Sequence, residues 1–142
     1  MQTFLPYPSF IDSAKSLDSK RLGKQRVEAY QILKNLVRER DRWYNHPAVQ
    51  MWLNYEEALK LYYDTILIEW IKRGYENNMP FMLVSRYKLV FPEWLGSKDF
   101  HDSHKSNLLR KNYGYYSRFN WNVSDDYQYV WPNRKGNYQD DG

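Results

Sequence analysis

Hydrophobic residues between Ser19 and Leu36 recur at the spacing of a helix with one apolar face. The residues on this face are Leu22, Ala29, Ile32, Leu33 and Leu36. Gln25 falls in the middle of the face, Arg21 and Glu28 lie along its flank, and Lys24 lies beside them. Half-buried polar groups need a hydrogen-bonding partner or a ligand. The pattern therefore predicts either a buried Arg21–Glu28 ion pair, with Gln25 bonded to a loop, or a functional site.

The chain before this helix is predicted to be extended and then to form a short helix. Pro6 and Pro8 disfavour a helix over the first eight residues. The α-amino group of Met1 is therefore expected to lie close to the folded body. Ser9 and Asp12 resemble a capping box, which predicts a short helix after them.

A long amphipathic helix is predicted over residues 47–73. Pro47 suits a first helical turn, and Gly74 is typical of the residue that ends a helix. Asn54 with Glu57 is expected to cap the helix again after a kink. We interpret this helix as the scaffold against which the central helix packs.

The rest of the chain is predicted to contain one more long helix. Residues 75–96 are rich in helix-breaking residues and are expected to be irregular. Ser97 is expected to cap a helix over residues 98–112, whose apolar face is shared by Phe100, His104 and Leu108. Residues 127–132 are expected to form an extended strip over the helices.

Length and composition predict a single all-α domain over residues 1–132 and a flexible tail over residues 133–142. The 142 residues include no cysteine, so no disulfide is expected. No apolar run approaches the length of about 20 residues that spans a membrane, and the first residues lack the pattern of a secretory signal. We expect a cytoplasmic monomer with no membrane partner.

Charge and aromatic content indicate a nucleic-acid partner. Residues 1–46 carry nine Lys and Arg against five acidic residues, and residues 97–118 carry five against two. Aromatic residues make up 18% of the chain, and 14 of them are tyrosines. Rings among basic residues suit everted or single-stranded bases, although a compact helical core also uses them. Composition alone leaves these two interpretations of the aromatic residues open.

The histidines do not predict a metal site. His101 and His104 lie three residues apart on one helix, but the chain has only one other histidine, His46, and no cysteine. A zinc site would need that distant residue or carboxylates. We expect no metal and no cofactor, and we interpret one histidine of the pair as a core residue and the other as a hydrogen-bonding or phosphate contact.

Two amines are candidate nucleophiles. The α-amine of Met1 has an ordinary pKa of about 8, so a usable fraction is neutral at physiological pH. Lys24 is the lysine nearest in sequence to Glu28. An amine can attack a sugar carbon to form an imine, while a neighbouring carboxylate such as Glu28 accepts protons and stabilises positive charge. A salt bridge from Glu28 to Arg21 or Lys24 is the structural alternative.

Three segments carry a family resemblance: RLGKQRVEAYQIL, then HPAVQMW, then an amphipathic helix ending in EWIKRGY. In this order they resemble the pyrimidine-dimer DNA glycosylase (endonuclease V) family. The chain is more similar still to small uncharacterised bacterial and phage proteins that begin MQTFLPYP and carry RLGKQRVE, HPAV-MW and SHKSNLLRK. The likeness covers approximately residues 1–118.

The resemblance implies a compact all-α domain that cuts the glycosidic bond at a damaged pyrimidine and then nicks the abasic site. It implies an N-terminal amine nucleophile, here that of Met1, and an essential glutamate, here Glu28, with Lys24 close by. It also implies that basic residues of the glutamate's helix bind the DNA backbone and that an aromatic C-terminal stretch helps to bind DNA. The residues expected to contact substrate or DNA are Arg21, Gln25, Arg26, His46, His101, His104, Lys105, Lys111, Tyr113, Tyr115, Tyr116 and Arg118.

The chain departs from the family pattern at three places. Alignment on the Leu-Gly pair of RLGKQR places Val27 at the glutamate position, and a shift of one residue restores Glu28. The family's amine is exposed by removal of the initiator methionine, whereas the bulky Gln2 favours retention of Met1. The segment from 101 to 111 has no counterpart in the characterised enzymes, which implies a different substrate.

Two other functions also fit the sequence. A nucleic-acid-binding module without catalysis would need neither Glu28 nor a free N-terminus. A different enzyme on the same scaffold, acting on a nucleotide or modified base, would bring five side chains into one pocket. Those side chains are Gln25, Glu28, His46, His101 and His104.

Overall fold

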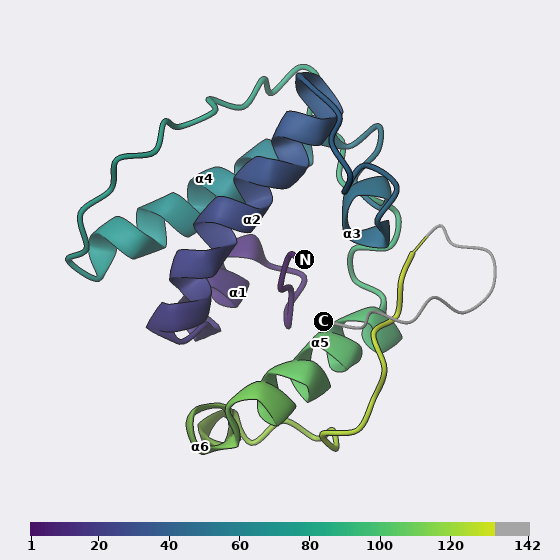
Figure 1. The fold of residues 1–142 in the computed structure, drawn as a ribbon. Coiled ribbons are helices and arrows are strands. Elements are labelled where there is room, and N and C mark those ends of the chain that lie inside the picture. The colour runs from purple at the N-terminus through teal and green to yellow at the C-terminus, as the bar shows by residue number, and fades with distance from the viewer. Residues whose placement is uncertain (133–142) are drawn as a thin grey trace.

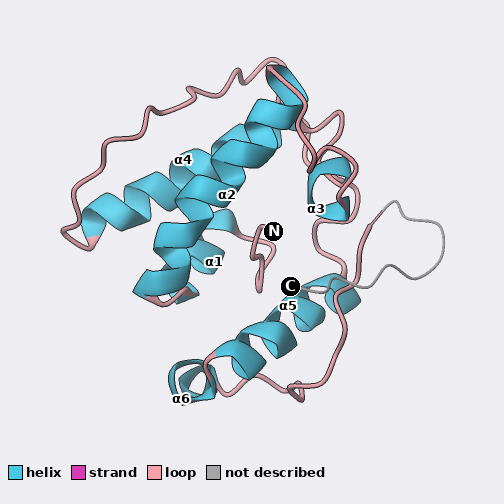
Figure 2. Ribbon diagram, in the orientation of Figure 1, coloured by secondary structure: helices cyan, strands magenta, loops and turns pink. Residues whose placement is uncertain are grey.

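Two long helices, α2 (Ser19–Val37) and α4 (Glu56–Lys72), pack against each other at the centre of the fold (Figure 1). The short helix α1 (Phe10–Ser16) packs on α4. The structure is a computed structural model that describes residues 1–132, and all regular elements in this range are helices (Figure 2). The predicted all-α fold in one compact domain is confirmed, whereas the tail predicted over 133–142 lies outside the described residues. No described helix is long and apolar enough to span a membrane.

The N-terminal segment lies inside the ring of helices. Figure 1 shows the first residues between α2 and the later helix α5 (Lys98–Lys111). Residues 2–5 are each at most 6% exposed. Thr3 Oγ1 accepts a hydrogen bond from the indole Nε1 of Trp52 at 3.1 Å. The start of the chain is therefore part of the core, which agrees with the predicted position close to the folded body.

Helix α2 has the apolar face that the sequence predicts. Leu22, Ala29, Ile32 and Leu33 are at most 1% exposed, and so is Gln25. The helix ends at Val37. The face packs on α4, so the predicted role of α4 as the scaffold is confirmed.

A glycine sets the closest approach of α2 to α4. A methyl group added at Gly23 would lie 3.1 and 3.2 Å from two ring carbons of Trp70. We expect Gly23→Ala to destabilise the fold by roughly 1–2 kcal/mol, because overpacking outweighs the better helix propensity of alanine. Urea unfolding would measure this loss. Gly114→Ala is the control, since the nearest atom to its added methyl is Asn112 Oδ1 at 3.9 Å; a Gly23→Ala protein as stable as the native protein would contradict the expectation.

The helix predicted over residues 47–73 is interrupted. Helix α3 (Pro47–Gln50) is separated from α4 by a turn in which Asn54 has a left-handed φ of 71°. Asparagine tolerates this conformation, but a right-handed helix cannot continue through it. Glu57, which was expected to help cap α4, instead accepts a hydrogen bond from the backbone N–H of Ser85 at 2.7 Å.

The C-terminal half agrees with the prediction except in its ring-rich stretch. Residues 75–96 are irregular, and Ser97 precedes α5, as predicted. After α5 the chain forms two short helices, α6 (Tyr113–Tyr116) and the 3-10 helix η1 (Ser117–Phe119), which the sequence pattern did not predict.

An extended segment over residues 125–130 runs along α5 and is bonded to its polar side chains. Ser103 Oγ and Ser106 Oγ accept hydrogen bonds from backbone N–H groups of the segment at 3.2 and 2.9 Å. Asn107 Nδ2 donates to Tyr127 O at 3.2 Å. Ser106 and Asn107 follow Ser103 by three and four residues, so the three side chains share one face of the helix, which we call the polar stripe. The extended strip that the sequence predicts over the helices is therefore present and is bonded to the polar stripe.

Candidate active site

A cavity of about 300 Å³ lies where the N-terminal segment, α2 and the C-terminal end of α5 meet. The N-terminal segment contributes Met1, Gln2 and Phe4; α2 contributes Lys20, Arg21, Lys24, Gln25 and Glu28; the C-terminal part contributes Lys111 and Tyr129. The three residues predicted to be catalytic, Met1, Lys24 and Glu28, therefore border the same cavity.

Gln25 connects the N-terminal segment to α2 through its side-chain amide. Nε2 donates to Gln2 O at 2.9 Å, and Oε1 accepts a hydrogen bond from the Phe4 N–H at 3.0 Å. The Tyr62 hydroxyl lies 2.8 Å from the same Oε1. The amide in the middle of the apolar face thus holds residues 2–4 in place, and the expected bonding of Gln25 to a neighbouring loop is confirmed.

The Glu28 carboxylate is half-buried at the edge of the cavity. Its Oε2 accepts hydrogen bonds from the Gln2 N–H at 3.2 Å and from Gln25 Nε2 at 3.1 Å. The predicted Arg21–Glu28 ion pair is wrong, because Arg21 Nη1 instead pairs with Asp18 Oδ2 at 3.1 Å. Glu28 is therefore bound to the start of the chain and not to a cation of its own helix.

Position 28 faces the cavity, whereas position 27 does not. The Val27 side chain is 47% exposed and is not part of the cavity lining, whereas Glu28 borders the cavity. Of the two registers for the glutamate motif, the geometry thus supports the one that uses Glu28.

The α-amino group of Met1 lies near this carboxylate. Gln2 N is 3.2 Å from Glu28 Oε2, and only two backbone atoms separate Gln2 N from the amine nitrogen. Backbone dimensions then place the amine nitrogen within about 7 Å of the carboxylate. Among the described residues no ion pair joins the two groups, and both Met1 and Glu28 border the cavity.

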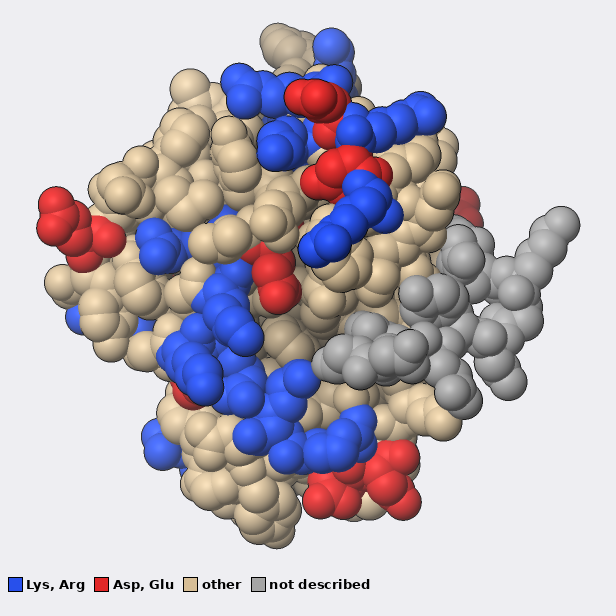
Figure 3. All heavy atoms as spheres, in the orientation of Figure 1, with Lys and Arg blue, Asp and Glu red and all other residues tan. Residues whose placement is uncertain are grey.

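Basic side chains surround the cavity. Lys20 and Lys24 are exposed on α2, Arg21 lies between them, and Lys111 faces them from the end of α5. Figure 3 shows a continuous band of lysine and arginine on this face of the molecule, with acidic side chains beside it. A group of cations around a polar hollow attracts phosphates. The cavity therefore has a positively charged rim and is bordered by the first residue of the chain and by the Glu28 carboxylate.

The histidine pair of α5 is buried against the N-terminal segment and does not reach the cavity. His104 Nδ1 accepts a hydrogen bond from the Leu5 N–H at 2.9 Å, and His101 Nδ1 lies 2.7 Å from Leu5 O. His101 and His104 are 4% and 0% exposed. The expectation that they contact substrate or DNA is corrected: both hold the backbone of Leu5.

His46 lies elsewhere and has a local structural role. Its Nδ1 accepts a hydrogen bond from the Ala48 N–H at 3.0 Å at the start of α3, and its ring contacts Trp43 and Trp131. The five side chains that the second alternative requires therefore do not converge. Within residues 1–132 no group of three or more His, Cys, Asp or Glu side chains could hold a metal ion.

The burial of His104 predicts acid sensitivity. Removal from water, with a smaller contribution from His101, lowers the pKa of His104 from 6.5 to about 3. The unfolded chain therefore protonates His104 more readily than the folded chain does. The free energy of unfolding keeps its full value above pH 6.5 and decreases as the pH falls towards 3. The free energy of unfolding should decrease by up to about 1.4 kcal/mol per pH unit in this range.

Urea unfolding between pH 7 and pH 5, where few carboxylates titrate, would measure this slope. The His104→Phe protein should be less stable at pH 7, since Leu5 N–H loses its acceptor, but its stability should vary less with pH. An equal slope in both proteins would exclude His104 as the source.

Two of the predicted basic contacts lie outside the cavity. The Arg26 guanidinium lies 4.1 Å from the centre of the Trp70 ring, on the side of α2 that faces α4. Lys105 Nζ lies 5.3 Å from the Tyr7 ring. In both cases an aromatic ring holds the cation.

The predicted aromatic contacts also lie outside the cavity lining. Tyr116 is fully buried, whereas Tyr113 is 64% exposed. The Arg118 guanidinium lies 4.2 Å from the centre of the Tyr115 ring. Tyr113, Tyr115 and Arg118 do not border the cavity that Met1 and Glu28 line, and their contact with flanking DNA stays a prediction.

Sequence reasoning missed four lining residues: Gln2, Phe4, Lys20 and Tyr129. Lys20 lies one helical turn before Lys24, so helical spacing could have identified it. Phe4 and Tyr129 offered no such signal. They border the cavity together because their rings each contact His104, with centroids 6.1 and 5.6 Å from it.

The model of one protein family, described as pyrimidine dimer DNA glycosylase, matches residues 1–83. The match covers the N-terminal segment, α2 and α4, and therefore Met1, Lys24 and Glu28, whereas Lys111 and Tyr129 lie outside it. Neither the curated proteins nor the solved structures include a match.

Proposed function

The chain belongs to the pyrimidine dimer DNA glycosylase family, and from this premise we infer that it excises a damaged or modified pyrimidine from DNA. We assign the chemistry to the cavity between α2 and the N-terminal segment. An amine serves as the nucleophile and Glu28 as the acid–base group. Lys20, Arg21, Lys24 and Lys111 bind the phosphates that flank the reacting sugar.

The observation that carries this proposal is the hydrogen bond from the Gln2 N–H to Glu28 Oε2 at 3.2 Å. It brings the first residue of the chain to the carboxylate, and the buried amide of Gln25 holds residues 2–4 in that position. An amine with a carboxylate near enough to accept its proton is the arrangement that imine chemistry requires.

The reaction can be written with these groups alone. The amine nitrogen forms a bond to C1′ of the deoxyribose while the C1′–base bond breaks, and the base leaves with that electron pair and takes up a proton. Glu28 accepts a proton that the attacking nitrogen loses. The C1′–O4′ bond of the sugar then breaks, O4′ takes the proton held by Glu28, and the nitrogen and C1′ form a protonated imine. Water hydrolyses the imine to restore the amine. Loss of a proton from C2′ and of the 3′ phosphate before hydrolysis would cut the strand, which is the lyase step.

We favour the Met1 amine over Lys24 as the nucleophile. The Met1 backbone is attached to a buried, hydrogen-bonded segment, so its nitrogen has few positions available. Lys24 is exposed, and its long side chain must be ordered before it can attack. Lys24 fits better as a phosphate contact.

Borohydride trapping tests the proposal directly, because reduction of the imine leaves the protein joined to DNA. We expect an adduct with duplexes that carry a thymine dimer or an abasic site, and peptide mapping should place it on the first residue. Absence of an adduct with both duplexes would exclude the imine mechanism and favour the non-catalytic nucleic-acid-binding module.

A further inference from the structure

The cavity has two basic walls that come from distant parts of the chain. One wall is the first half of α2, with Lys20, Arg21 and Lys24, and the other is Lys111 at the end of α5. A phosphate can be held between them only if the two helices keep their relative position. The contacts that join the N-terminal end of α2 to the end of α5 are therefore relevant to binding.

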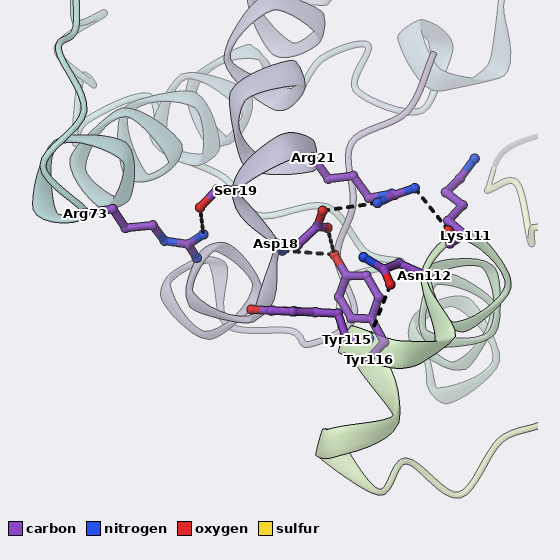
Figure 4. A network of polar contacts seen from close by, with 8 residues as sticks. All are labelled: Asp18, Ser19, Arg21, Arg73, Lys111, Asn112, Tyr115 and Tyr116. Atoms are coloured by element: carbon purple, nitrogen blue, oxygen red, sulfur yellow. Dashed lines mark hydrogen bonds and ion pairs between the residues drawn. The ribbon is translucent and has the colours of Figure 1, made fainter.

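Four groups form this connection, which we call the joint: Asp18, Arg21, Tyr116 and the backbone carbonyl of Lys111 (Figure 4). Arg21 Nη1 donates to Asp18 Oδ2 at 3.1 Å, and Arg21 Nη2 donates to Lys111 O at 3.4 Å. The Tyr116 hydroxyl donates to Asp18 Oδ1 and accepts from the Asp18 N–H, the latter at 3.0 Å. Arg21 thus contacts both walls.

The joint leaves Arg21 able to bind a ligand. A guanidinium has five N–H donors in a fixed plane, and the joint uses two of them. The Arg21 side chain is 17% exposed and borders the cavity. Asp18 and Lys111 O fix the plane of the guanidinium, and a fixed planar fork is the geometry that binds a phosphate through two hydrogen bonds.

Tyr116 supports Asp18, and its burial keeps it from contacting DNA. Its side chain is fully buried, and both bonds of its hydroxyl go to Asp18. Asp18 precedes the first residue of α2, but its carboxylate makes no capping hydrogen bond to that helix. The carboxylate is therefore committed to Arg21 and Tyr116.

We propose that Asp18 and Tyr116 are positioning residues that hold Arg21 for one phosphodiester of the DNA beside the reacting sugar. This inference rests on the proposed function for the identity of the ligand. According to this inference, the Asp18 carboxylate increases the affinity of the cavity for DNA. Its negative charge alone would decrease that affinity.

The positioning effect and the charge effect of Asp18 change DNA affinity in opposite directions, so a substitution can distinguish them. Asp18→Asn raises the net charge of the cavity by one unit. If Asp18 acted only through its charge, the variant would bind DNA more tightly and with a steeper dependence on salt. If it positions Arg21, the variant binds more weakly, by about tenfold, and the slope of log K against log salt falls by about one.

The experiment measures fluorescence-anisotropy binding of the full chain to a duplex with a tetrahydrofuran abasic analogue, over a series of salt concentrations. We expect Asp18→Asn and Tyr116→Phe to give the weaker binding and the lower slope. On a substrate duplex the same variants should raise KM by about tenfold and leave kcat within about twofold, because only the phosphate contact is lost.

Tyr63→Phe is the matched control. Tyr63 is also fully buried, and its hydroxyl donates to Pro80 O at 2.7 Å, away from the joint. The Tyr63→Phe protein should lose about as much stability as the Tyr116→Phe protein, but its DNA affinity and its salt slope should be unchanged. Unchanged or tighter binding by Asp18→Asn, or equal weakening by Tyr63→Phe and Tyr116→Phe, would overturn the inference. Because binding needs no catalysis, failure of borohydride trapping would remove the proposed reaction and leave this measurement decisive for the joint.

Discussion

Replacement of Glu28 by glutamine is expected to lower the rate of base excision by roughly 10²- to 10⁴-fold, the usual contribution of a general acid–base group. DNA affinity should stay within a few-fold, because the amide keeps an oxygen that accepts the Gln2 N–H. Single-turnover excision kinetics together with anisotropy binding would separate the two quantities. The loss should appear in kcat and not in KM, since the carboxylate acts on the reacting centre.

Glu57→Gln is the matched control for this substitution. Glu57 pairs with Lys60 at 2.7 Å and accepts the Ser85 N–H, so it is a hydrogen-bonded carboxylate away from the cavity. Its removal should cost some stability and no activity. A fully active Glu28→Gln protein would show that this carboxylate takes no part in the reaction.

A residue added before Met1 is expected to abolish imine trapping, with a loss of at least about 10²-fold if the α-amine is the nucleophile. The extension converts the amine to an amide, which has no free electron pair for attack. Binding to the abasic analogue should survive, because the basic rim is unchanged. The same protein with and without a removable N-terminal tag provides the comparison, with trapping and binding measured in parallel.

The Lys24→Gln substitution tests the other candidate nucleophile. It should weaken binding and lower the salt slope by about one as a phosphate contact, while trapping at saturating DNA persists. The reverse pattern, in which the tagged protein reacts and Lys24→Gln does not, would assign the nucleophile to Lys24.

The intact mass of the protein should also be measured, because removal of Met1 would make Gln2 N the amine, 3.2 Å from Glu28 Oε2. Peptide mapping of the trapped adduct distinguishes the two. An adduct on Gln2 would keep the role of Glu28 and change the residue that reacts.

Local patterns predicted most of the helices. Helix α5 ends one residue before its predicted end, and Ser9 Oγ accepts the Asp12 N–H at 3.1 Å, as its predicted cap requires. Gly74 follows α4 with a φ of 90°. Periodicity and capping lie within the segment that they describe, so a sequence reveals them directly.

Features that depend on distant residues were predicted less well. Glu57 does not cap α4 as expected, because it bonds to the N–H of Ser85, 28 residues further along the chain. His101 and His104 share the helical spacing of a site, but burial against Leu5 decides their role. Tyr129 enters the cavity from a segment that α5 holds, and no local signal identifies such a partner.

The burial of the first residues has a consequence for synthesis. The backbone of Leu5 bonds to His101 and His104, which follow it by 96 and 99 residues. A ribosome must therefore complete nearly the whole domain before Leu5 can reach its final partners. Until then the side of this segment that packs on α5 stays uncovered on the nascent chain, which is a state open to chaperones and to aggregation.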